Sequence, residues 1–335
     1  MLTQRCQKQW LAAILVAIGV AGCSTFEPPM EPRSPTESET RAETVPEPPP
    51  IESKEALEVD PDRMRVAILF TAAVQSYQNI ADEIAARGAI HDYAIFSLAN
   101  GKMTGSDAEA LRKFNPDQLV AIGLAAAKAG QQLDALPMVF CQVFNYQEHA
   151  LLSARSKGVK LLPPFDLQLQ AWQEISPHIQ TIGVVAGPDQ QELIREIQQA
   201  ADSQGIELLT KRVYSDKELL NAFKRLTPQI QAFWLLPDNR LLSPSVLREI
   251  FPYAQKHDVQ IAVFSQQLLD FGADISFTSQ AANVADTVLK VLGSSGQSDS
   301  VRGPEMNPLS SLTVRLSERL ETRSAKQAAA RHTAN

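Results

Sequence analysis

A strand–helix–strand unit at residues 181–213 constrains the fold of this chain more than any other stretch. It opens with a short apolar, β-branched run, which predicts a buried strand. Asp189 then stands at an expected N-cap position, with Glu192 three residues later in the pattern of a capping box. The apolar residues that follow recur at helical spacing, and Gly205 predicts the end of the helix before the next strand. Parallel strands joined in this way need a right-handed crossover, so the unit predicts the α/β class.

The same alternation runs through the rest of the chain. A second capping-box pattern, Ser106 with Glu109, predicts the start of another helix, and Ser243 with Pro244 predicts one more. We therefore predict parallel sheets in two Rossmann-like lobes. We place residues 61–165 and 272–323 in the first lobe and residues 166–271 in the second. The further buried strands are expected at residues 66–70, 93–96, 119–122, 138–141, 232–236, 260–264 and 275–278.

The N-terminus has the pattern of a lipoprotein signal peptide. Arg5 and Lys8 precede an apolar run at residues 10–22, which is shorter than the roughly 20 residues that span a bilayer core. The run ends in small residues before Cys23, which resembles the bacterial lipobox. We predict a signal peptide at residues 1–22 and acylation, including palmitate, on Cys23. An ordinary signal peptide or a buried N-terminal helix is the alternative.

Residues 23–60 combine that cysteine with a segment rich in Pro, Glu, Ser and Thr. Such a composition cannot bury enough apolar surface to fold, so we predict a tether, which acts as a passive spacer or carries a recognition motif. Ser24 follows the cysteine where Asp would favour the inner membrane under the lipoprotein sorting rule. The resemblance thus implies an outer-membrane anchor facing the periplasm. A disordered tail is expected at residues 324–335.

Charge and motif content exclude several function classes. The formal net charge of -7 argues against a general nucleic-acid binder, which needs a basic face. The cysteines and histidines lack metal-ligand spacing, so no metal site is predicted. No GxSxG elbow, P-loop or GxGxxG fingerprint is present, and Cys141 ends a buried strand. We predict no enzyme activity and no cofactor.

The order of elements resembles the ABC-transporter substrate-binding protein family whose better-known members bind aromatic amino acids. The resemblance covers most of the chain after the tether. It implies the type I periplasmic-binding fold, in which crossover strands join two lobes around a ligand cleft. It also implies a small-molecule ligand and an ABC permease as partner. The matching segments are residues 121–123, 136–140, 182–185, 235–239, 260–264 and 309–320.

Two turns depart from the family pattern. Leu124 and Ala125 follow Gly123 where the family usually has a small hydroxyl residue. After the fourth strand, Gln142 and its neighbours replace an Asp-Pro type turn. Both changes remove polar groups that a small zwitterion would use, so the sequence leaves the ligand class open.

Ligands of such sheets bind beyond the carboxyl ends of the strands, which defines the candidate site. No Lys or Arg occurs at these positions, so no clamp for a carboxylate or phosphate is predicted. Aromatic residues would stack on a flat ligand and amides would hold its edge, unless the aromatic residues belong to the lobe cores. Asp238 would receive an amine or hydroxyl, unless it serves turn and cap chemistry. The candidates are Thr71, Gln75, Tyr77, Gly123, Leu124, Gln142 and Phe144 in the first lobe, and Gln190, Asp238, Asn239, Ser265 and Gln266 in the second.

Two functions follow from this reading. The first is a lipoprotein that binds a small solute between its lobes for an ABC-type uptake system or an outer-membrane receptor. The second is an outer-membrane lipoprotein whose binding-protein-like fold regulates a periplasmic enzyme, such as a cell-wall synthase. The altered turns and the predicted outer-membrane anchor favour the second function.

Overall fold

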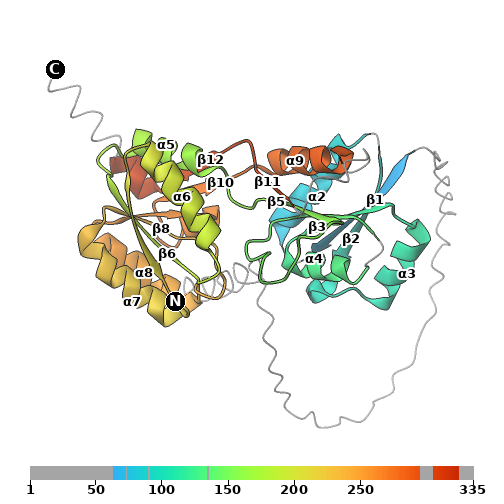
Figure 1. The fold of residues 1–335 in the computed structure, drawn as a ribbon, viewed down its shortest axis with the longest axis horizontal. Coiled ribbons are helices and arrows are strands. Elements are labelled where there is room, and N and C mark those ends of the chain that lie inside the picture. The colour runs from blue at the N-terminus through green and yellow to red at the C-terminus, as the bar shows by residue number, and fades with distance from the viewer. Residues whose placement is uncertain (1–62, 73, 90, 134–135, 295–304, 324–335) are drawn as a thin grey trace, which may run out of the picture.

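The computed structural model describes residues 63–323 with the exception of 73, 90, 134–135 and 295–304. The predicted signal peptide, Cys23, the tether and the tail at 324–335 lie outside the described residues. The chain forms two α/β lobes that lie side by side (Figure 1).

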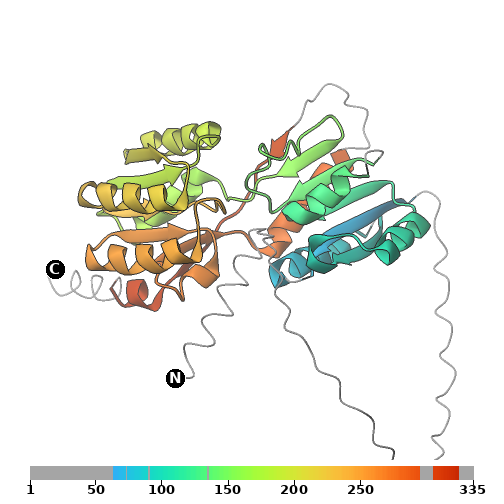
Figure 2. The same cartoon turned by 90° about the horizontal axis from the view of Figure 1, so that it is seen from below.

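The first lobe is built on a parallel sheet with the strand order β11-β5-β4-β3-β1-β2. Its central strands are buried apolar runs, as expected for a sheet covered on both faces. Helices α2 and α9 cover one face, and α3 and α4 cover the other (Figure 2). The strands are β1 (Met64–Thr71), β2 (His91–Leu98), β3 (Gln118–Ile122), β4 (Met138–Cys141), β5 (Ser156–Val159) and β11 (Met306–Asn307). The helices are α2 (Gln75–Arg87), η1 (Ala99–Gly101), α3 (Gly105–Phe114), α4 (Leu124–Gln131) and α9 (Ala281–Ser294).

The second lobe has the strand order β12-β10-β9-β8-β6-β7, and only its edge strand β12 runs antiparallel to its neighbour. Helices α5 and α6 pack on one face of this sheet, and α7 and α8 pack on the other. The strands are β6 (Thr181–Ala186), β7 (Glu207–Arg212), β8 (Ala232–Trp234), β9 (Gln260–Val263), β10 (Ile275–Thr278) and β12 (Thr313–Leu316). The helices are α5 (Phe165–Ile175), α6 (Gln191–Ser203), α7 (Asp216–Leu226), η2 (Thr227–Gln229), α8 (Pro244–Lys256) and η3 (Gln266–Leu268).

The chain crosses between the lobes at residues 160–164, 279–280 and 308–312. The first and third crossings are held together where they leave the first lobe, because the Lys160 backbone N–H donates to the Asn307 carbonyl over 2.8 Å. The predicted α/β class with two lobes and parallel sheets is confirmed.

The boundary predicted for residues 272–323 differs from the structure. We expected this whole segment in the first lobe, but β10 and β12 belong to the second sheet. The Asp274 backbone N–H donates to the Ile261 carbonyl, so the chain continues beside β9 before it crosses. Among the described elements of this segment, α9 and β11 join the first lobe.

Two predicted helix caps are also wrong. Helix α3 is capped by Thr104, whose side chain and Asp107 form the capping box in place of Ser106 and Glu109. Helix α6 has no side-chain cap, because the carboxylate of Asp189 is engaged elsewhere. The cap predicted for α8 is confirmed, since the Ser243 hydroxyl accepts from the Val246 backbone N–H. Within the described part of the chain, no helix has the length and apolar character needed to cross a membrane.

Candidate ligand-binding site

A pocket of about 420 Å³ lies between the two lobes. Its volume falls within the range of small-molecule sites. The loop after β4 contributes one wall, α6 contributes the opposite wall, and the first crossing segment forms the side between them. The lining residues are Val143, Phe144, Tyr146, Gln147, Lys160, Leu161, Leu162, Pro163, Pro164, Phe165, Asp166, Gln190, Glu192, Leu193, Glu196, Gln199, Ala200, Met306 and Pro308.

Most of the wall is apolar and is fixed by the core of the second lobe. Phe144 extends from the first lobe and packs against that core. Phe165, at the start of α5, lines the pocket and meets Trp234 edge to face, with ring centroids 5.5 Å apart. This geometry is the favoured one for aromatic pairs, so the pocket has a firm aromatic wall.

Charged groups stand in the same pocket. The Lys160 Nζ donates to both carboxylate oxygens of Glu196 at 2.7 Å, which joins the crossing segment to α6. Glu192 and Asp166 also line the pocket, and both are exposed. Burial raises the pKa of the Tyr146 phenol, and the nearby carboxylates of Glu192 and Glu196 raise it further. The pocket therefore carries more negative than positive charge.

A buried polar network beside the pocket joins the lobes directly. Asn145, which is 6% exposed, follows β4 in the first lobe. Its Nδ2 donates to Asn239 Oδ1 at 3.2 Å and to Asp238 Oδ1 at 3.4 Å, and its Oδ1 accepts from Gln190 Nε2 at 3.0 Å. Since the three partners belong to the second lobe, Asn145 connects the carboxyl ends of strands from both sheets.

Arg240 completes this network. Its guanidinium donates to Asp238 Oδ2 at 2.6 Å and to Asp189 Oδ1 at 2.8 Å, and it lies 3.5 Å from Glu148 of the first lobe. The hydrogen bond to Asp238 is the main cause that raises the pKa of Arg240, and Asp189 adds to the effect. Asp238 is 2% exposed, so a paired cation is what allows a carboxylate to be buried there.

The structure brings together four of the predicted site residues. Phe144 and Gln190 line the pocket, while Gln190, Asp238 and Asn239 meet through Asn145.

The remaining predicted residues lie elsewhere. Tyr77 is buried against Gly123, and burial raises the pKa of its phenol. Gln75 is exposed and donates to Asn79 on its own helix, while Thr71 and Leu124 lie at the end of β1 and the start of α4. Gln142 has a positive φ of 59° just after β4, and the Ser265 hydroxyl donates to Gln267. Gln266 lines a separate groove of about 740 Å³ on the second lobe.

Sequence reasoning missed Asn145, Arg240 and Lys160. The candidate positions contain no Lys or Arg, but Arg240 bonds directly to the predicted Asp238. Arg240 directly follows the predicted pair Asp238 and Asn239, so its position along the chain was available as a clue. Lys160 lies in a crossing segment, where a search restricted to strand ends does not reach.

The pocket offers no evident nucleophile or metal site. Across the described residues, no group of three or more His, Cys, Asp or Glu side chains is arranged to hold a metal ion. Cys141 is fully buried, and burial raises the pKa of its thiol to about 12. The thiol is therefore protonated at neutral pH, which makes it a poor nucleophile.

No protein-family model and no curated protein sequence matches this chain. Solved structures do match it. One is the ABC domain in complex with L-Trp from Streptococcus pneumoniae, with a TM-score of 0.54, 17% identity, and coverage of 78% of this chain and 95% of that chain. The chain has the type I periplasmic-binding fold. A ligand-free, open substrate-binding protein with adhesive properties from Clostridium difficile shares this fold, with a TM-score of 0.58, 14% identity, and coverage of 78% and 95%.

The type I periplasmic-binding fold thus confirms what the family resemblance implied about architecture. At this level of identity the comparison establishes the fold, and the chemistry of the site has to be argued from the residues of this chain.

Proposed function

We propose that this protein binds a small solute between its two lobes and releases it without chemical change. The observation that carries the proposal is the 420 Å³ pocket, whose walls come from both lobes and combine apolar side chains with a few polar groups. Such a site is the usual form of a small-molecule pocket between domains. The binding-protein fold supports the proposal, since both neighbours compared above belong to proteins of ABC or substrate-binding type.

The sequence extends this proposal to the cell envelope. We propose that Cys23 is acylated, that residues 24–60 tether the lobes, and that the anchor lies in the outer membrane facing the periplasm. The protein then delivers its solute to an ABC permease or holds it for an outer-membrane receptor. More than one acyl chain gives the stable anchoring that this role needs.

A solute screen tests the binding function. Thermal unfolding of the mature chain, beginning at Cys23, is measured with amino acids, nucleosides, amines and small peptides. A solute present at 100 times its Kd stabilises the folded state by about 2.7 kcal/mol. The matched control is Ala200→Trp, which places a large side chain in the pocket. Binding at the pocket predicts a stabilisation that this variant loses, and equal stabilisation of both proteins contradicts it.

The anchor has its own test. Cells producing the wild type or Cys23→Ser are labelled with palmitate and fractionated. The wild type is expected to carry label and to sediment with outer membranes, whereas Cys23→Ser carries none. Label in the variant, or an unlabelled and unprocessed wild type, excludes the anchor.

A second candidate function rests on the network around Asn145. Both carboxylate oxygens of Asp238 are bonded within the protein, to Arg240 and to Asn145. A cleft whose polar groups satisfy one another holds its lobes together without a solute, as suits a protein that regulates a periplasmic enzyme through its surface. The test adds the purified chain to a cell-wall synthase assay, where this function predicts a change in rate that Ala200→Trp leaves intact. No change in rate removes the synthase as the regulated enzyme.

A further inference from the structure

We propose that the pocket between the lobes selects an organic cation, namely a small amine with an aromatic or aliphatic body and no carboxylate. The inference rests on the proposed solute-binding function, and it names the chemical class that this one pocket accepts.

The walls define the body of the ligand. Leu193 and Ala200 on α6 face the pocket across from Leu162 and Phe165 of the crossing segment and α5, while Phe144 closes the side of the first lobe. These side chains offer no hydrogen bonds, so they favour an apolar ligand body. Positions 193, 196 and 200 recur at helical spacing, so one face of α6 lines the pocket.

The charged side chains of the pocket define the polar end of the ligand. Glu192, Glu196 and Asp166 line the pocket with a single cation, Lys160, among its described lining residues. Because Lys160 already donates to both oxygens of Glu196, it is neutralised, and Glu192 and Asp166 are left in excess. Within the described residues, no salt bridge of Glu192 is found. An ammonium group gains from this field, whereas a ligand carboxylate meets repulsion and has to compete with Glu196 for Lys160.

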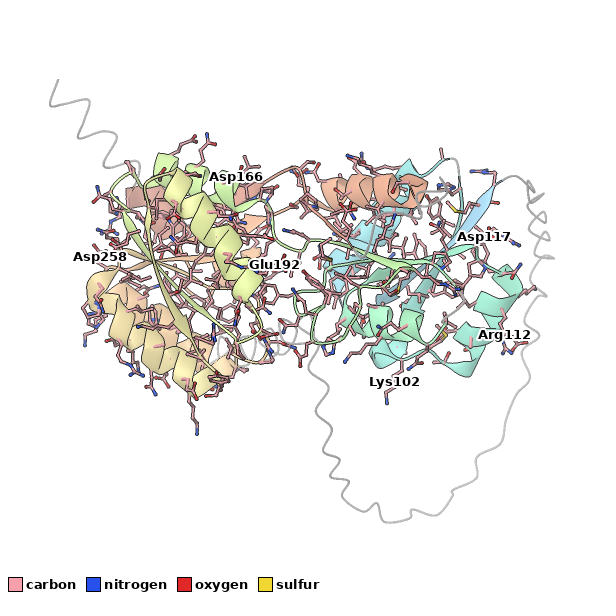
Figure 3. The ribbon with its side chains drawn as sticks, viewed as in Figure 1. Lys102, Arg112, Asp117, Asp166, Glu192 and Asp258 are labelled. Atoms are coloured by element: carbon pink, nitrogen blue, oxygen red, sulfur yellow. The ribbon has the colours of Figure 1, made fainter. Side chains whose placement is uncertain are left out.

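The position of Glu192 places the cationic end near the first lobe. Figure 3 shows Glu192 on the end of α6 that faces the first lobe, whereas Asp166 belongs to the first turn of α5. The N-terminus of α6 by itself would favour an anion, but Glu192 stands in its first turn and supplies that negative charge.

Gln190 adds an oriented acceptor. It lines the pocket and is 3% exposed. Its amide nitrogen donates to Asn145 Oδ1 at 3.0 Å and approaches Asp189 Oδ2 at 3.5 Å. Because the Gln190 amide nitrogen bonds within the protein, the side-chain carbonyl oxygen of Gln190 is the group that remains for a ligand. This oxygen accepts hydrogen bonds from an ammonium group.

Three indoles that carry different charged groups test the inference. Isothermal titration of the mature full chain uses tryptamine, L-tryptophan and indole-3-acetate. Tryptamine is expected to bind at least tenfold more tightly than L-tryptophan, and indole-3-acetate still more weakly. Glu192→Gln is expected to weaken tryptamine binding about tenfold, the effect of losing one charge-assisted hydrogen bond. Glu109→Gln, the same change on the distant helix α3, leaves the affinity unchanged.

The outcomes separate this inference from the proposed function. If L-tryptophan or indole-3-acetate binds as tightly as tryptamine, the cation class is wrong while solute binding stands. If tryptamine binding is unaffected by Glu192→Gln, or if none of the three indoles binds, the inference is also overturned. Solute binding itself fails only if the thermal screen finds no solute whose effect Ala200→Trp removes.

Discussion

At the scale of single residues, Asn145 connects the two lobes through its side-chain amide. It is the kind of residue that periodicity does not reveal, because its partners lie 45, 93 and 94 positions away along the chain. Phe144 was predicted from its place after a strand, but nothing in the sequence indicates that the next residue forms the contact. The hydrogen-bond partners of a buried amide can be identified only from the folded structure when they lie far away along the chain.

Replacing Asn145 measures this contact. Asn145→Ala removes the 3.0 Å hydrogen bond of the buried Gln190 amide and one of the hydrogen bonds to the buried Asp238, so we expect it to lower the free energy of unfolding by about 1–3 kcal/mol. Urea denaturation gives the value. Asn79→Ala, which removes an exposed amide bonded within α2, is the control and should cost less than about 0.5 kcal/mol. Equal losses in the two variants would show that the network contributes nothing.

Gly123 is fixed by its conformation and by its neighbour. Its φ is +88°, and a Cβ there would lie 2.5 Å from the ring of Tyr77. Gly123→Ala is therefore expected to cost about 2–4 kcal/mol, from backbone strain together with overpacking. Gly105→Ala in α3 meets no atom within 4 Å and should be neutral or slightly stabilising. Thermal unfolding compares the two variants. A Gly123→Ala protein as stable as the wild type would contradict the expected strain and overpacking at Gly123.

At the scale of elements, the sequence predicts which helices and strands exist better than it predicts where each of them begins and ends. Apolar runs locate the strands, because buried parallel strands have no polar face. The start of α3 shows the limit, since Thr104 and Ser106 are both suitable N-caps and only the backbone path selects Thr104. Asp189 was a reasonable cap for α6, yet its carboxylate bonds to Arg240 instead. A local capping preference gives way where an ion pair with Arg240 takes the same carboxylate.

The cap of α3 predicts a pH dependence. The hydrogen bonds from Thr104 lower the pKa of Asp107 in the folded state. A lowered folded pKa stabilises the protein above the unfolded pKa of about 3.9, and this contribution is lost as the pH falls through the folded pKa. Thr104→Ala is expected to cost about 1 kcal/mol at pH 7 and less at pH 3, by urea denaturation. In an Asp107→Asn background its cost should be the same at both pH values.

At the scale of the whole molecule, the lobes are interwoven along the chain. The sequence indicated the alternation and the first crossing, but it assigned β10 and β12 to the wrong lobe. That error has a physical cause, because a strand that pairs in either sheet carries the same apolar pattern and only its register identifies the partner. The pocket was predicted only in part, because the crossing segments form much of its wall and the prediction considered the ends of the strands.

The late helix α9 makes the interweaving testable. Val288 is fully buried where α9 covers the first sheet, beside residues of β1 and α2. Val288→Asp places a charge in that core and is expected to cost more than about 3 kcal/mol. Hydrogen exchange should rise in β1 and α2 while β6 and β8 stay protected. Lys290→Asp, at an exposed position of the same helix, should leave the exchange pattern unchanged.

The return of α9 to the first lobe sets an order of events during biosynthesis. The ribosome delivers the N-terminal half first, yet the surface formed by β1, β3 and α2 stays partly bare until residue 294 arrives. Throughout that interval the nascent protein presents an apolar area to its surroundings. The unfinished chain is therefore most exposed to aggregation before α9 is complete.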